Sequence, residues 1–253
     1  MEIVFHKKIV LVTGASRGIG KATAQLFAES GATVIIHYHT NREAAESVFK
    51  SLSGDHMICQ ADMAKPDDLT RMVNHAISRY GRIDILVNNA GMYVENDMLN
   101  MPFEAFIDYW ESSIRVNLTG PALLSNLVTR EMVRTGGGKI LNVTSRGAFR
   151  GEPTAWAYGA AKAGLNATGQ SMAKALAPHG IYVFTLAPGF VETDMTIPGL
   201  AGEKRKEIES QSPLNRVAQP EEIAQGILLL AAPGNEYMTG CILDMNGASY
   251  LRT

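Results

Sequence analysis

Cysteine, long hydrophobic runs and net charge are all scarce in this chain. Its 253 residues include two cysteines, Cys59 and Cys241, which show neither metal-ligand nor redox spacing, so we expect a reduced, cytoplasmic protein without a metal site. The early apolar run Ile9–Val12 is too short for a signal peptide core or a membrane span. With 23 basic and 25 acidic residues the net charge is -2, which gives nucleic acid and anionic membranes no general attraction. A small molecule is therefore the expected partner.

What the chain does contain is the composition of a globular enzyme. Hydrophobic residues make up 46% and charged residues 19%, which is enough apolar surface to build a full core. Neither a Ser-, Pro- or Gly-rich linker nor an internal repeat interrupts the sequence. We therefore expect residues 1–253 to form one domain.

Strand-like and helix-like segments alternate along the chain, and Gly, Pro, Asn or Asp lie at their ends. The expected strands are Ile9–Val12, Thr33–His37, His56–Gln60, Ile83–Val87, Lys139–Val143, Ile181–Leu186 and Cys241–Met245. The expected helices are Ile19–Ser30, Arg42–Ser51, Pro66–Tyr80, Phe103–Arg134, Ala157–Pro178 and Pro220–Ala231. This alternation predicts an α/β fold, a doubly wound Rossmann domain whose parallel sheet of about seven strands has helices on both faces.

The longest irregular stretch begins at Pro188 and runs to about Gly202. It carries several apolar side chains, among them Phe190, Met195 and Leu200. Long apolar loops in compact domains are usually lids or binding loops, so we predict a substrate lid at about residues 188–212.

Tyr158 and Lys162 are four positions apart in a predicted helix, and Ser145 ends the buried strand that precedes them. Residues i and i+4 share one helix face, so the Lys162 ammonium could lower the pKa of the Tyr158 phenol. Lowering it from about 10 to about 7 needs about 4 kcal/mol, which one charge at about 4 Å can supply. Such a pair alone is common on helix surfaces. Here it follows Ser145 at the carboxyl end of a strand, where ligands bind in open α/β sheets.

The first strand is followed by a glycine-rich turn that opens a helix, with the spacing Gly14-x3-Gly18-x-Gly20. Glycines there let backbone N–H groups and a helix N-terminus approach a pyrophosphate. The spacing departs from the general Gly-x-Gly-x-x-Gly pattern, so the phosphate site is indicated by the position of the turn at the first strand-to-helix junction.

Taken in order, these motifs resemble the short-chain dehydrogenase/reductase family in its single-domain form, over essentially the whole chain. The resemblance is closest to the 3-oxoacyl-(acyl-carrier-protein) reductase branch. The matching residues are Thr13-Gly14-x3-Gly18-x-Gly20, Asn88-Asn89-Ala90-Gly91, Ser145, Tyr158-x3-Lys162 and Pro188-Gly189 with Thr193.

The resemblance implies catalytic roles for four side chains. Asn117 resembles the asparagine that holds a water leading to the lysine. Ser145 would bind the substrate carbonyl, Tyr158 would protonate its oxygen, and Lys162 would lower the pKa of the tyrosine and bind the nicotinamide ribose. The reaction implied is hydride transfer between a nicotinamide and a carbonyl carbon.

The resemblance also implies a set of cofactor-binding residues. Asp62 would contact the adenine, Asn89 and Gly91 would line the ribose, and Thr193 would hold the carboxamide. The full set is Thr13, Gly14, Ser16, Arg17, Gly18, Ile19, Gly20, Asp62, Asn89, Ala90, Gly91, Tyr158, Lys162, Pro188, Gly189, Val191 and Thr193.

The end of the second strand favours NADP(H) over NAD(H). An acid there would bind the ribose 2′-hydroxyl, but the chain has no acid until Glu43, and Arg17 lies in the glycine turn. His37 and His39 share a strand face, but no third ligand follows at metal spacing, so they are expected beside the adenosine pocket or in solvent.

The substrate stays open between several classes. We expect reduction of a 3-oxoacyl thioester or another small ketone, with a sugar, polyol or hydroxy-acid dehydrogenase as the alternative and a non-catalytic dinucleotide-binding regulator as the different class. The resemblance implies a homotetramer and allows an acyl carrier protein as partner. Candidate pocket residues are Gly147, Phe149, Glu152, Trp156, Phe190 and Met195.

Overall fold

The structure is a computed structural model that describes residues 3–196 and 202–252. Seven strands form one parallel sheet in the order β3-β2-β1-β4-β5-β6-β7. The strands are β1 (Ile9–Val12), β2 (Thr33–Tyr38), β3 (Met57–Gln60), β4 (Ile85–Asn88), β5 (Gly138–Val143), β6 (Ile181–Pro188) and β7 (Ile242–Met245). This confirms the predicted fold class. The strand order reverses between β1 and β4, where ligands bind in such sheets.

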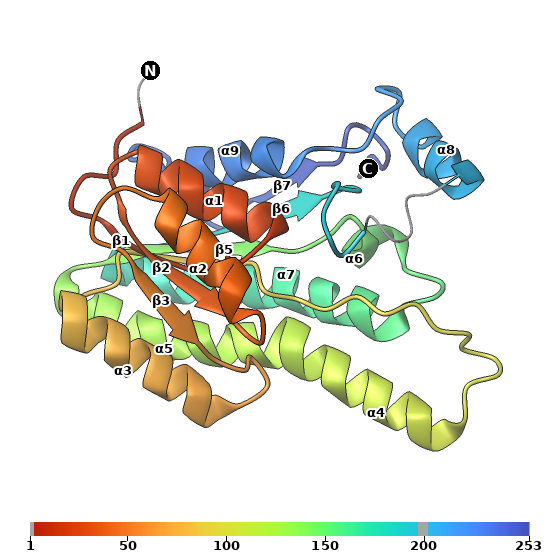
Figure 1. Ribbon diagram of the computed structural model, residues 1–253, viewed down its shortest axis with the longest axis horizontal. Helices are drawn as coiled ribbons and strands as arrows, with labels where there is room; N and C mark the ends of the chain where they lie inside the picture. The colour runs from red at the N-terminus through yellow and green to blue at the C-terminus, as the bar shows by residue number, and fades with distance from the viewer. Residues whose placement is uncertain (1–2, 197–201, 253) are drawn as a thin grey trace.

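Helices cover both faces of the sheet (Figure 1). One apolar cluster joins the sheet to α1 (Gly18–Glu29), α2 (Arg42–Ser51) and α9 (Pro220–Ala231). The other joins it to α3 (Pro66–Tyr80), α5 (Gly120–Thr135) and α7 (Trp156–Leu176). Strands buried between two helical layers need apolar side chains on both faces, which explains why β1 is a continuous Ile-Val-Leu-Val run.

Local signals in the sequence set several helix ends. Asn41 caps α2 by accepting the Ala44 N–H at 2.9 Å. Pro66 takes the first position of α3, and Gly81 ends that helix with φ 75°, a left-handed conformation that favours glycine. The bounds of α2, α3 and α9 are those expected from the sequence.

The long helix expected at Phe103–Arg134 contains an irregular turn. It consists of α4 (Phe103–Ile114), one π-turn at Arg115–Thr119 and α5. Asn117 lies in that turn, which is wider than an α-turn because its hydrogen bonds run from i to i+5. A π-turn inside a helix often marks a functional position.

Two short helices differ from the sequence expectation. α6 (Gly147–Arg150) follows Ser145, and α8 (Gly202–Ser210) lies within the segment expected to be an irregular lid. In Figure 1 both lie beyond the end of the sheet to which the strands point. The sequence of α8 shows no periodic pattern of apolar residues, because Ile208 is the one buried residue of this helix. Positions 197–201 of the expected lid fall outside the described residues.

No helix in the described part of the chain is long and apolar enough to span a membrane.

Candidate active site

A cleft of about 620 Å³ opens at the carboxyl ends of the central strands. Its walls come from the turn after β1, the loops after β4 and β5, and the segment after β6. Ser145, Tyr158 and Lys162 lie in the same cleft as the glycine-rich turn. The structure therefore brings together two groups of motif residues, the glycine-rich turn and the Ser-Tyr-Lys set, that are more than a hundred positions apart in the sequence.

The glycine-rich turn needs glycine for two separate reasons. Gly14 and Gly18 have φ values of 64° and 52°, in the left-handed region. A Cβ on Gly20 would lie 2.2 Å from the Gly14 carbonyl oxygen, so α1 could not pack against the turn. Arg17, the residue before α1, makes no capping hydrogen bond to described residues, which leaves the first N–H groups of the helix available to an anion.

Buried hydrogen bonds hold this turn from below. The Thr13 hydroxyl donates to the Val87 carbonyl and accepts the N–H groups of Asn89 at 2.9 Å and Ala90 at 3.0 Å. The Asn89 amide donates in return to the Thr13 carbonyl at 2.9 Å. The ends of β1 and β4 are thus tied together directly beneath the cleft.

His37 adds a third tie, from β2. Its Nδ1 accepts the Gly14 N–H at 2.9 Å, and its Nε2 lies 3.0 Å from the Ala61 carbonyl oxygen, to which it donates. This pattern requires a neutral ring with the proton on Nε2. Burial lowers the pKa of His37 to about 4, against a hydrogen bond to Ala61 that raises it, so the ring stays neutral at pH 7.

Tyr158 and Lys162 extend from α7 toward the loop that carries Ser145. The Lys162 ammonium donates to the Val143 carbonyl at 2.9 Å and lies 5.6 Å from the centroid of the Tyr158 ring. The Ser145 hydroxyl oxygen accepts the Gly147 N–H at 3.0 Å, which fixes the serine at the start of α6.

Asn117 braces the loop that faces this lysine. Its Nδ2 donates to the Met92 carbonyl at 2.9 Å, and its Oδ1 accepts the Met92 N–H at 3.0 Å. A Cβ on Gly91 would lie 2.8 Å from Asn117 Oδ1 and 3.6 Å from Lys162 Nζ. Glycine at position 91 therefore leaves room beside both polar groups.

The protein environment shifts the pKa values of Tyr158 and Lys162 in the directions that favour their uncharged forms. Burial raises the pKa of Tyr158 above its ordinary value, Ser145 opposes this rise through a hydrogen bond, and Glu152 and Tyr93 add to it. Burial lowers the pKa of Lys162 to about 8. The expected lowering of the Tyr158 pKa by Lys162 is therefore not found in the protein alone. Burial is the largest cause of the raised Tyr158 pKa, and the Lys162 ammonium is bound to the Val143 carbonyl.

The structure places most of the predicted cofactor residues on the cleft wall, and two of them below it. Thr13 and Gly20 lie beneath the glycine turn, where they shape it. Sequence reasoning did not assign several further wall residues, including Met63, Met92, Val116 and Thr144. The cleft is also lined by His37, in β2, and by three residues that follow β2, namely His39, Thr40 and Asn41.

The candidate pocket residues are placed differently from the sequence expectation. Of the candidate pocket residues, Met195 lies on the cleft wall. Phe149 and Phe190 instead pack against the guanidinium groups of Arg252 and Arg146, at 4.4 and 5.0 Å. The presence of apolar residues in a loop does not show which of them will be covered by an arginine side chain.

Tyr93 is a neighbour of Tyr158 that the sequence analysis did not single out. Its ring meets the Tyr158 ring edge-on at a centroid distance of 5.0 Å. The signal available in the sequence was its position two residues after Gly91, in the loop at the end of β4. Burial raises the pKa of Tyr93 to about 12, so it stays protonated beside Tyr158.

The fold and the cleft define a class: an oxidoreductase of the short-chain dehydrogenase/reductase family, to which the chain belongs. Residues 14–247 match the family described as enoyl-(acyl carrier protein) reductase. The particular relatives share a narrower name. The chain is 38% identical to the 3-oxoacyl-(acyl-carrier-protein) reductase of Synechocystis sp., over 95% of this chain and 96% of that one. It is also 38% identical to the reductase FabG of Vibrio cholerae, over 96% of this chain and 98% of the relative.

Solved structures agree with this assignment. A dehydrogenase/reductase from Sinorhizobium meliloti superposes with a TM-score of 0.91 and 27% identity, over 99% of this chain and 98% of the other. The protein named gox2181 also superposes with a TM-score of 0.91, at 29% identity, over 98% of this chain and 97% of the other. The cleft of about 620 Å³ that Gly14, Gly18 and Gly91 line without side chains fits a nicotinamide dinucleotide, which is the cofactor of this family.

Proposed function

We propose that this protein uses NADP(H) to reduce a ketone to a secondary alcohol, with a 3-oxoacyl thioester as the first substrate class. The observation that carries the proposal is the convergence of Ser145, Tyr158 and Lys162 in the cleft that also contains the glycine-rich turn. The named activity of the relatives in Synechocystis and Vibrio cholerae supports the choice of thioester.

A dinucleotide held by the glycine-rich turn and Thr193 would supply a hydride, two electrons with one proton, to the carbonyl carbon. Ser145 holds the carbonyl oxygen, and Tyr158 gives that oxygen its proton, which completes the alcohol. A raised pKa keeps Tyr158 protonated at neutral pH, so the protein alone is poised for reduction. Lys162 returns the proton to Tyr158, and Gly91, which has no side chain, leaves space between the Lys162 ammonium and Asn117 Oδ1.

The preference for NADP(H) rests on the groups near the end of β2. His37 is buried and committed to the glycine turn, so it offers nothing to a ribose. Arg17 and His39 have side chains that are both 60% exposed, and they line the cleft together with Thr40 and Asn41. A dianionic 2′-phosphate is attracted by such groups, whereas a ribose hydroxyl gains little from them.

A polar ketone, such as a keto sugar or a keto acid, is the second candidate substrate. Glu152 places a largely covered carboxylate near Tyr158, and burial raises its pKa against the pull of Arg150 and Arg146. A purely apolar acyl chain would form neither a hydrogen bond nor an ion pair with that carboxylate. The different class, a regulator without turnover, is disfavoured because all four catalytic side chains are present.

We also propose assembly as a homotetramer through the helices around Asn117 and Tyr158. Phe103 and Trp156 are 71% and 47% exposed on α4 and α7, although both are large and apolar. Burial against another copy would remove this surface from water. Delivery of the substrate by an acyl carrier protein remains part of the thioester proposal.

Two measurements test the activity. NADPH oxidation is followed with a 3-oxobutyryl thioester, simple ketones, a keto sugar and a diketone, and the proposal requires turnover of at least one of them. Tyr158→Phe should lower kcat by roughly a thousandfold while NADPH affinity stays within about twofold, because it removes one proton and little surface. Unchanged activity in this variant would contradict the assigned proton donor.

A further inference from the structure

The helix α8 is joined to the rest of the protein by charged side chains on more than one side. Arg205 lies 3.2 Å from Glu192, which follows β6, and Lys204 lies 3.1 Å from Glu95, in the loop after β4. Arg205 is also bound within α8 to Glu209 at 2.7 Å. Ion pairs thus connect α8 to two segments, the loop after β4 and the segment after β6, that also contribute residues to the cleft.

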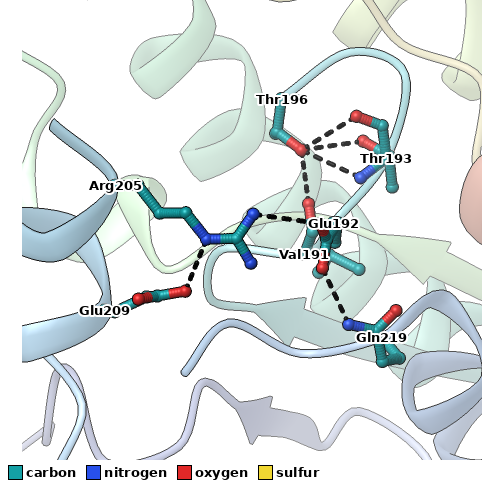
Figure 2. A network of polar contacts seen from close by, with 7 residues as sticks. All are labelled: Val191, Glu192, Thr193, Thr196, Arg205, Glu209 and Gln219. Carbon is teal, nitrogen blue, oxygen red and sulfur yellow. Dashed lines mark hydrogen bonds and ion pairs between the residues drawn. The ribbon is translucent and has the colours of Figure 1, made fainter. Parts of the chain in front are cut away.

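Glu192 is the centre of this arrangement (Figure 2). One carboxylate oxygen accepts from Arg205, and the other accepts from the Gln219 amide at 2.9 Å. The Glu192 N–H in turn donates to the Ala218 carbonyl at 2.9 Å. Another nearby cation, Arg216, is occupied by both oxygens of Glu222 at 2.6 and 2.7 Å. Arg205 is therefore the cation through which α8 reaches this carboxylate.

The residues after Glu192 form a tight turn that lines the cofactor cleft. The Thr196 hydroxyl accepts the Thr193 N–H at 3.0 Å and donates to the Val191 carbonyl (Figure 2). Thr193 packs on the glycine-rich turn, since a Cβ on Gly18 would lie 3.1 Å from its methyl group. A displacement of Glu192 would therefore also move the neighbouring turn that carries Thr193 and lines the cleft.

We propose that α8, which lies beyond the carboxyl end of the sheet (Figure 1), covers the substrate, and that Arg205 is a positioning residue that couples this helix to the turn 191–196 on the nicotinamide side of the cofactor. The contacts run without a gap from Arg205 to Glu192, then to Thr193 and Gly18. Binding of substrate under α8 then tightens the cofactor, and by reciprocity the cofactor tightens the substrate. The inference rests on the proposed function for the identity of both ligands.

The size of the effect follows from exposure. Arg205 and Glu192 are 39% and 28% exposed at their side chains, so water screens the pair and its loss is modest. A modest coupling suits a lid, because a strong one would hold product in the cleft. We expect Arg205→Gln to weaken NADPH binding by about threefold, with kcat changed by less than about twofold.

The test compares three variants by NADPH fluorescence titration, with and without 3-hydroxybutyryl-N-acetylcysteamine, an alcohol that cannot react with NADPH. In the wild type the alcohol should tighten NADPH binding. Arg205→Gln should abolish this coupling, and Arg205→Lys should restore it in part because the positive charge returns. Lys206→Gln is the matched control, because Lys206 is exposed on the same helix and has no ion pair among the described residues.

Hydrogen exchange separates this proposal from the proposed function. Arg205→Gln should speed amide exchange in residues 191–196 and raise the Kd for NADPH even if every carbonyl in the panel fails. Failure of the panel would contradict the reductase assignment and leave this readout intact. Unchanged exchange and unchanged NADPH affinity in Arg205→Gln, or equal effects in Lys206→Gln, would overturn the positioning role.

Discussion

The two sides of the cleft are held by different kinds of interaction. On the β1 side, Thr13, Asn89 and His37 form neutral hydrogen bonds, and Thr13 and His37 among them are fully buried. On the α8 side, Lys204 and Arg205 form ion pairs that water reaches. Neutral buried hydrogen bonds are costly to break, whereas exposed ion pairs contribute little. The β1 side of the cleft is therefore expected to be rigid, and the proposed substrate cover at α8 to be readily adjusted.

The largest effect is expected at Gly20, on the rigid side. In Gly20→Ala the new Cβ would meet the Gly14 carbonyl oxygen at 2.2 Å and the Asn89 amide nitrogen at 2.6 Å, and backbone must move. We expect a loss of about 1 to 3 kcal/mol in the free energy of unfolding and roughly hundredfold weaker NADPH binding. Denaturant unfolding and fluorescence titration measure both. Gly159→Ala is the control, because its Cβ would have only ordinary contacts beyond 3.5 Å; an equal loss there would contradict this explanation.

A second test of the rigid side uses the pH dependence of stability. The pKa of His37 is about 4 in the folded protein and 6.5 as its ordinary value, so the unfolded chain gains the proton first as pH falls. The contribution of His37 to the free energy of unfolding is thus fully present above about pH 6.5. It is lost as the pH falls toward 4 and amounts to about 3 kcal/mol. His37→Asn should remove this part of the pH dependence of unfolding. The exposed His75→Gln is the control, and a wild-type slope retained in His37→Asn would refute the assignment.

The smallest effect is expected on the adjustable side. Lys204→Gln removes an ion pair whose side chains are 52% and 47% exposed. We expect an increase of about twofold in the KM for the carbonyl substrate, which disappears at high ionic strength because salt screens the wild-type pair as well. Steady-state kinetics at two salt concentrations measure it. A tenfold effect would mean that the two sides of the cleft are not as different as described.

The sheet and its order of elements were predictable because the strands of a two-sided parallel sheet are continuous apolar runs. Helix ends followed from Asn41, Pro66 and Gly81, which act through their own backbone or side chain. α8 was not predictable, since its one buried residue leaves no apolar period. The π-turn at Asn117 was not predictable either, for a different reason: the hydrogen bonds of Asn117 go to Met92, 25 positions away, and leave no local pattern.

In the site, motif residues were predictable and their neighbours were not. Spacing within a helix or a turn relates Tyr158 to Lys162 and Gly14 to Gly18 directly. The placement of Tyr93 against Tyr158 depends instead on how the loop after β4 folds over α7. The effect of burial on the pKa of Tyr158 also depends on surroundings that no local motif contains.

The central claim is hydride transfer to a carbonyl with Tyr158 as proton donor. The most direct measurement is a single turnover with NADPH deuterated at the transferring position and a 3-oxobutyryl thioester, followed by mass spectrometry of the product. We expect one deuterium on the new carbinol carbon for each NADPH oxidised by the wild type, and almost no product from Tyr158→Phe, which still binds NADPH. Labelled product formed equally fast by both proteins, or no labelled product from the wild type with any carbonyl tested, would contradict the account.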